Sequence, residues 1–126
     1  MIKNLASFNA ALEKTIQTLP VEGALRLQRM IALEALKRIV LKTPVDTGRA
    51  RGNWQTTINN PAVGEKQSNT PIMDGSTVIG SLKSFGTIFI ANNLVYILPL
   101  EHGHSQQAPN GMVAVTIEEL RSMFPT

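Results

Sequence analysis

The stretch from Val21 to Leu41 constrains the fold most, because it predicts a long helix with almost no polar face. It contains no proline and a single glycine, and thirteen of its twenty-one residues are apolar. At 100° per residue Glu22, Arg26, Arg29 and Lys37 fall on one narrow stripe, and nearly everything else is apolar. Such a helix must be covered on more than one side, and we expect a neighbouring subunit to cover one of them. The helix is predicted to end at Thr43-Pro44, because the residue before a proline avoids helical backbone angles.

The rest of the chain predicts short elements around this helix. Helices are expected over 4–18 and 94–102, and from a capping box at 116–119 to about 123. Strands are expected over 53–59, 87–91 and 112–116, with a brief strand or turn over 77–80 and an exposed loop over 61–75. The predicted fold class is α+β, with an N-terminal long helix packed on a small, mostly antiparallel sheet and short additional helices.

The 126 residues have room for one domain, with residues 1–42 forming its helical part and residues 43–126 its sheet part. Charged residues make up 17% of the chain, below the roughly 25% of ordinary soluble domains. We interpret this low charge as the mark of a subunit that hides surface against copies of itself or against partners. A sparingly charged monomer is the alternative.

Several classes of protein are excluded or disfavoured by composition. The absence of cysteine excludes disulfides, thiolate metal sites and a cysteine nucleophile. The first twenty residues carry three charges and no continuous apolar core, unlike a secretory signal. The longest uncharged stretch, 84–100, is broken by asparagines and a proline and is shorter than the about 20 residues of a membrane span. We therefore expect a soluble protein made in the cytosol.

The tripeptide Asp46-Thr47-Gly48 matches the signature of aspartic proteases, whose half-size members dimerise to bring two aspartates together. That chemistry needs the motif to follow a buried strand in an all-β body, whereas here a long helix precedes it. Arg49 would also hold both carboxylates ionised and spoil the shared proton. A homodimeric protease using Asp46 is therefore a minor alternative to an aspartate that turns the chain after the helix. We find no catalytic set and predict that the protein is not an enzyme.

His102 and His104 flank a glycine and could share a metal ion, but a site needs three or four ligands. Glu101 is the nearby carboxylate, and on a helix it would point away from His102. We therefore predict surface or interface histidines beside a helix C-terminus, with no metal and no cofactor. We interpret Gly103 and Gly111 as residues that serve the backbone conformation and have no chemical role.

Positive charge is concentrated in the first half of the chain, where residues 1–63 carry nine basic and four acidic side chains. The run of cations comprises Arg26, Arg29, Lys37, Arg38, Lys42, Arg49 and Arg51. Aromatic residues do not alternate with them, as they would in a binder of single-stranded nucleic acid. We interpret the run first as a solvated helix face, second as a contact with an acidic rim of a partner, and third as a surface near DNA. A small DNA-binding protein remains an alternative.

Two segments taken together resemble a known family. Residues 43–54 read T-P-V-D-T-G-R-A-R-G-N-W and follow an N-terminal helix. Residues 91–96 read A-N-N-L-V-Y, and residues 100–113 read L-E-H-G-H-S-Q-Q-A-P-N-G-M-V. In content, order and spacing these blocks resemble the tail-component family of tailed bacteriophages, the small neck and tail-completion proteins. The chain departs from the family pattern at His102, where an aromatic is commoner, and at residues 97–99.

The resemblance implies a virion component, assembled in the host cytoplasm, that forms a homo-oligomeric ring at the head–tail junction. The ring is expected to be six-fold and to act as tail terminator, tail-completion protein or neck connector. Its partners would be other copies of itself, the head-closure or connector protein, and the tail tube or tail terminator, with phage DNA passing nearby. The candidate interface residues are Asp46, Arg49, Arg51, Trp54, Glu101, His102, His104, Gln106, Gln107 and Met112.

Local alternatives remain open for several of these residues. Asp46, Arg49 and Arg51 are expected to pair across a subunit boundary or within the chain, where they would hold the turn after the helix. Trp54 is expected in the core, with a role as interface anchor as the alternative. The segment 103–111 is predicted to be extended and polar, and Gln106 and Gln107 suit hydrogen bonds across a subunit boundary.

Overall fold

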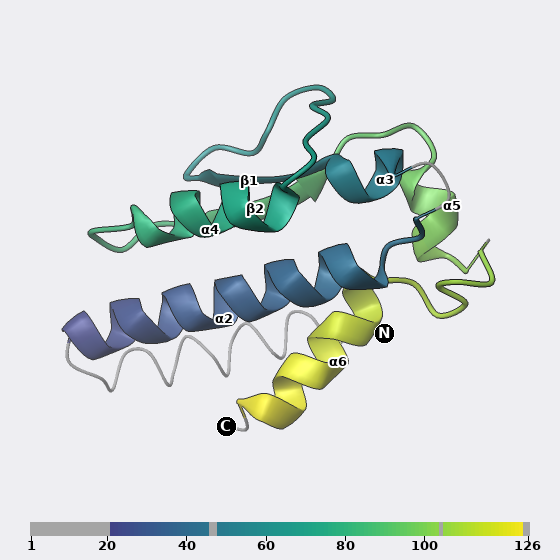
Figure 1. The fold of residues 1–126 in the computed structure, drawn as a ribbon. Coiled ribbons are helices and arrows are strands. Elements are labelled where there is room, and N and C mark those ends of the chain that lie inside the picture. Colours follow the sequence, from purple (N-terminus) through teal and green to yellow (C-terminus); the bar gives the residue numbers. More distant parts are fainter. Residues whose placement is uncertain (1–20, 46–47, 104, 125–126) are drawn as a thin grey trace.

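The computed structural model describes residues 21–45, 48–103 and 105–124. In this part the elements, labelled as in Figure 1, are α2 (Val21–Lys42), α3 (Arg49–Gly52), β1 (Trp54–Ile58), α4 (Pro71–Gly80), β2 (Ile88–Asn92), α5 (Ile97–Glu101) and α6 (Val113–Met123). The α+β class, the long helix and an antiparallel sheet are confirmed. The helix predicted over 4–18 lies outside the described residues.

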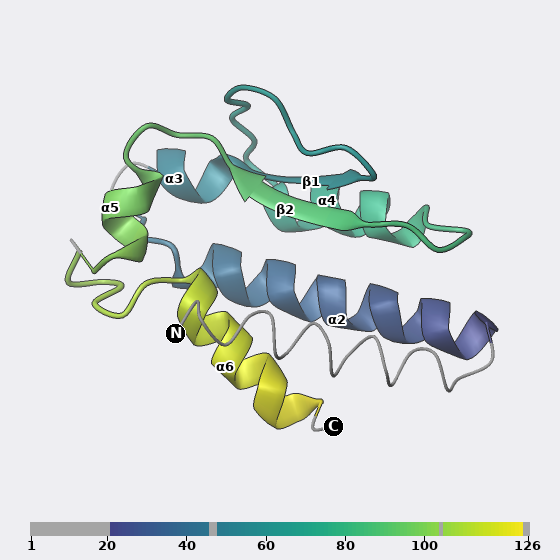
Figure 2. The same ribbon diagram turned by 180° about the vertical axis from the view of Figure 1, so that it is seen from behind.

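Helix α2 lies in the middle of the molecule, with the sheet and α4 on one side of it and α6 on the other (Figures 1 and 2). Towards the sheet, Leu36 and Val40 pack in a cluster with Trp54. Towards α6, Ile31 packs against Ile117 and Leu120 in a second cluster. The helix is therefore covered on two sides, as its pattern requires, but the second cover is the chain's own α6. The apolar pattern alone had led us to expect a neighbouring subunit there.

The sheet consists of β1 and β2, which pair antiparallel from Trp54 opposite Asn92 to Ile58 opposite Ile88. Both strands lie within one residue of their predicted positions. Alternate residues point to opposite faces of a strand, and Ile88 and Ile90 pack against the core that includes α2. The described sheet is small, and a helix separates its two strands in sequence.

That helix, α4, was not predicted: residues 71–75 were assigned to an exposed loop and 77–80 to a strand or turn. Pro71 stands in the first turn, where the missing N–H costs nothing. Gly75 is buried between α2 and β1, and a Cβ at this position would overlap Leu36 Cδ2 and Thr56 Oγ1. The glycine that made the segment look like a loop is therefore the residue that lets α4 approach its neighbours.

The strand predicted over 112–116 is also wrong, because these residues form the connection into α6 and its first turn. The capping box is wrong with it. Thr116 is a buried residue inside the helix rather than its N-cap, and Glu119 reaches towards α2.

In the described ranges, no helix is long and apolar enough to cross a membrane.

The helix predicted over 94–102 is confirmed in a shorter form, as α5. The segment 103–111 is not extended, and its described residues follow a series of turns. Gly103 and Gly111 have φ angles of 86° and 84° in the left-handed region, where glycine is unstrained. A Cβ at either position would also collide with backbone, that of Pro109 and Glu101 respectively. This geometry agrees with the interpretation that both glycines serve the backbone conformation.

Candidate functional site

The two segments that carry the family resemblance meet at one end of the molecule, where α2 ends and α6 begins (Figure 1). We call this region, formed by residues 41–54 and 91–113, the junction. The Val45 N–H donates to Gln107 Oε1 at 2.9 Å, and Asn92 Nδ2 donates to the Ala50 carbonyl at 2.8 Å. Segments separated by about forty residues are thus bound to each other directly.

Thr43 and Trp54 form the buried centre of the junction. The Thr43 hydroxyl donates a hydrogen bond to the Ile39 carbonyl, in the last turn of α2, at 2.7 Å. The same hydroxyl accepts a hydrogen bond from Trp54 Nε1 at 2.8 Å. A buried indole needs such a partner. Trp54 is therefore a core residue in this chain, as the first of its two interpretations predicted.

The two arginines of the junction make contacts within the chain. Arg51 donates from Nε to the Thr43 carbonyl at 3.2 Å and from Nη2 to the Leu41 carbonyl at 2.9 Å. This places a cation on the free carbonyls at the C-terminus of α2, where the helix dipole favours it. Arg49 forms an exposed ion pair with Glu65 at 2.9 Å. Asp46 lies outside the described residues, so its pairing with either arginine stays a prediction.

Glu101 caps the N-terminus of α6. Its carboxylate accepts hydrogen bonds from the backbone N–H groups of Met112, Val113 and Ala114 at 2.9, 2.9 and 3.0 Å. These are N–H groups that a helix start leaves without partners, and a negative charge there is favoured by the helix dipole. Sequence reasoning missed this role, because the acceptor lies more than ten residues before the helix that it caps.

The remaining candidate residues divide between the core and the surface. The Met112 side chain is fully buried, at 0% exposure, and packs in the cluster around Leu36, which removes it from the surface of the chain. His102, Gln106 and Gln107 are exposed. His104 lies outside the described residues.

The junction is hollowed on its surface. A depression of about 260 Å³ lies between the end of α2, Arg51, the 107–111 turn and α6. Its lining mixes apolar side chains such as Leu41 and Val115 with the polar Gln107 and Arg51. Leu41 is 60% exposed and the neighbouring Val45 is also exposed. The site therefore offers an apolar rim with hydrogen-bonding groups beside it, a composition typical of protein contact surfaces.

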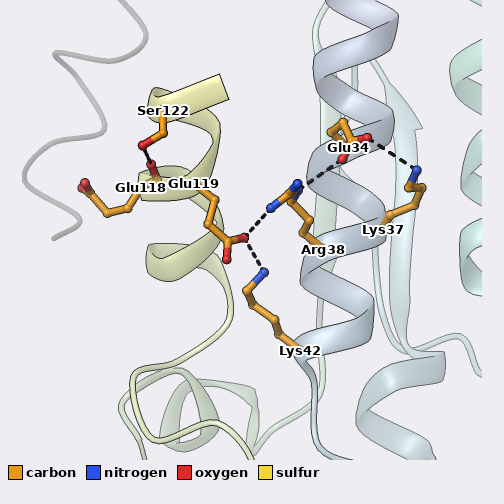
Figure 3. A network of polar contacts seen from close by, with 7 residues as sticks. All are labelled: Glu34, Lys37, Arg38, Lys42, Glu118, Glu119 and Ser122. Carbon is orange, nitrogen blue, oxygen red and sulfur yellow. Dashed lines mark hydrogen bonds and ion pairs between the residues drawn. The ribbon is translucent and has the colours of Figure 1, made fainter. Parts of the chain in front are cut away.

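Three cations of α2, Lys37, Arg38 and Lys42, form ion pairs with carboxylates of the chain. Figure 3 shows Arg38 and Lys42 of α2 converging on Glu119 of α6, with Glu34 held between Lys37 and Arg38. We call these five residues the ion network. Among the other cations, Arg29 donates to the Leu82 carbonyl at 2.9 Å. Two cations of the run, Arg38 and Lys42, therefore join α2 to α6 instead of forming only a solvated face.

The network shifts the pKa values of Glu34, Arg38 and Glu119 in the direction that favours their charged forms. The hydrogen bond from Lys42, followed by that from Arg38, lowers the pKa of Glu119. The hydrogen bond from Arg38 lowers the pKa of Glu34. In turn, the hydrogen bond to Glu119 raises the pKa of Arg38. All three groups are therefore charged at neutral pH.

Two further kinds of site, a metal centre and a protease dyad, can be compared with this geometry. Across residues 21–45, 48–103 and 105–124, no three His, Asp or Glu side chains are grouped to hold a metal ion. The Asp46 segment follows helix α2 and precedes helix α3, whereas the dyad of an aspartic protease needs a preceding buried strand. Comparison with known proteins adds no assignment, because no family model, curated protein or solved structure matches the chain.

Proposed function

We propose that this chain is a structural, non-enzymatic component of the virion of a tailed bacteriophage. It would be one subunit of a six-fold ring at the head–tail junction that completes the tail or joins the tail tube to the head-closure complex. Other copies of the chain, the head-closure or connector protein and the tail tube or terminator are its proposed partners.

One observation carries the proposal. The two blocks that resemble the tail-component family fold against each other through the bonds of Val45 to Gln107 and of Asn92 to Ala50. Both blocks line one hollowed, partly apolar surface. A ring subunit needs such contact surfaces, since each copy presents two different faces to its two neighbours. We propose that the junction supplies one of these faces.

The ring is tested by sedimentation velocity and electron microscopy of the purified full chain. We expect annular particles with six-fold symmetry, formed alone or on addition of the head-closure protein of the same phage. In the phage, interruption of the gene should leave filled heads and tails that do not join. A chain that stays monomeric with its neighbours present, and that is absent from purified virions, would contradict the proposal.

A further inference from the structure

Strand β2 has one open side. The Asn59 N–H donates to the Thr87 carbonyl at 2.7 Å, which makes this pair the last hydrogen-bonded pair of the ladder. Hydrogen-bonded and non-hydrogen-bonded pairs alternate in an antiparallel sheet. The backbone groups of Ile88, Ile90 and Asn92 therefore point away from β1. No backbone segment of the described residues bonds to them on that side.

The opposite edge of the sheet, along β1, is occupied. Gln55 Nε2 donates to the Gly64 carbonyl at 2.8 Å, and the Lys66 N–H donates to Asn53 Oδ1 at 2.9 Å. Helix α4 packs on the same strand, with Gly75 against Thr56. The sheet thus has one covered edge and one edge that meets solvent. In Figure 2, β2 lies in front of β1 with no labelled element before it.

The open edge lacks the features that keep such edges apart. Natural proteins protect an edge strand with lysine, proline, a bulge or a covering segment. Strand β2 has no charge and no proline, and its register with β1 is continuous. It lies in the uncharged stretch 84–100, whose flanks expose Phe85, Val95 and Leu98, the valine to 89%. An edge without these features is prone to pair with another strand.

We propose that the open edge of β2 binds β2 of a second copy of this chain, antiparallel, about a two-fold axis at Ile90. The product is a continuous four-stranded sheet. Centring the axis on Ile90 pairs it with its own copy and pairs Ile88 with Asn92, so all three outward-pointing residues are used. The cross-strand pairs between them bring Phe89 of one copy against Ala91 of the other.

A second copy fits this edge because β2 carries no charge that self-pairing would set against its own copy. A strand that faces itself brings its charges against identical charges, which destabilises the pair. Between Ser84 and Leu100 the chain has none, so self-pairing meets no repulsion. The contact goes beyond the proposed ring, because a two-fold contact closes on itself whereas ring contacts run head to tail. Either proposal can fail without the other.

The experiment compares two double variants of the full chain. Phe89 and Ala91 lie on the face of β2 opposite to the core-packed Ile88 and Ile90, so both variants keep the core. In Phe89→Lys/Ala91→Lys, like charges oppose each other at both cross-strand pairs. In Phe89→Glu/Ala91→Lys, opposite charges meet at the same places, with the same loss of apolar surface. We expect the second to dimerise on the order of tenfold or more tightly than the first in sedimentation equilibrium.

Hydrogen exchange gives a readout that is specific to the edge. The Ile90 amide should exchange slowly in the wild-type dimer and quickly on dilution or in the Lys/Lys variant. The Phe89 amide, which points to β1, should stay protected in all of them and so reports that the sheet is folded. A wild-type chain that is monomeric at every concentration overturns the proposal. So do equal affinities of the two variants, or fast exchange of Ile90 in the dimer.

Discussion

At the scale of single residues, Gly75 sets how closely three elements can approach. It belongs to α4 and lies against Leu36 of α2 and Thr56 of β1. We expect Gly75→Ala to destabilise the fold by about 1–3 kcal/mol, because the added methyl group has no space and the core must shift. Urea unfolding followed by circular dichroism measures the difference. Gly80→Ala is the matched control, since nothing lies within 4 Å of a Cβ there; an equal loss in both variants would refute the explanation.

Glu101 is the second residue whose replacement should have a disproportionate effect. Glu101→Gln removes the negative charge that three backbone N–H groups of α6 share, and we expect a loss of about 1–3 kcal/mol in the free energy of unfolding. Thermal or urea unfolding gives this quantity, and hydrogen exchange should show the first turn of α6 opening preferentially.

The same substitution at Glu65 is the control for Glu101. Glu65 forms an exposed ion pair with Arg49, so Glu65→Gln should cost less than about 1 kcal/mol. Equal effects of the two substitutions would mean that Glu101 acts as an ordinary surface charge rather than as a helix cap.

At the scale of elements, sequence reasoning succeeded where the pattern is local. The apolar period of α2 and the β-branched residues of β1 and β2 located these elements to within one or two residues. It placed the end of α6 at Met123 correctly but missed the start of this helix, whose apolar, β-branched residues favour a strand. The helix forms there because Glu101 caps it and because Ile117 and Leu120 pack on α2, contacts that no short window of sequence contains.

The candidate site, like the helices and strands, could be predicted from sequence only in part. The motifs indicated that residues 43–54 and 91–113 matter, but nothing in their sequence indicated that they touch. The bonds of Arg51 to the carbonyls of α2 and of Glu101 to the N–H groups of α6 depend on chain segments meeting in space. Side chains that looked available for a partner, Met112 above all, are therefore occupied within the chain.

The ion network between α2 and α6 should make the free energy of unfolding depend on pH in the acid range. The pKa of Glu119 in the folded chain lies below its ordinary value of 4.5, so its stabilising contribution is complete above that value. It is lost as the pH falls through the lower, folded pKa. We expect Glu119→Gln to cost at most about 1 kcal/mol at pH 7, because the carboxylate is partly exposed. Below the folded pKa the two proteins should be equally stable.

Urea unfolding of both proteins across this pH range gives the measurement, and added salt provides the control. The pairs are partly exposed, so the difference at pH 7 should shrink at high ionic strength. A difference that persists unchanged in strong acid would show that Glu119 acts through packing and not through charge.

At the scale of the whole molecule, many charged side chains pair with groups of the same chain, whereas several large apolar side chains are exposed to solvent. Carboxylates of the chain pair with Lys37, Arg38 and Lys42, and backbone carbonyls bind Arg51, which lowers the potential that these cations offer to phosphate. Meanwhile the junction rim and the flanks of β2 expose large apolar side chains. This distribution favours protein contacts over nucleic-acid contacts as the main activity of the surface.

The junction rim is where a single charge should separate assembly from folding. Leu41 lines the hollow and is 60% exposed, and Val21, at the other end of the same helix, is 63% exposed. A lysine at position 41 suits the C-terminus of α2, so Leu41→Lys should change stability by no more than about 0.5 kcal/mol. If the junction forms a ring contact, this variant should sediment as smaller species while Val21→Lys still forms rings. Rings that persist in Leu41→Lys would mean that the ring contact lies elsewhere, and equal loss in both variants would point to a general effect of added charge.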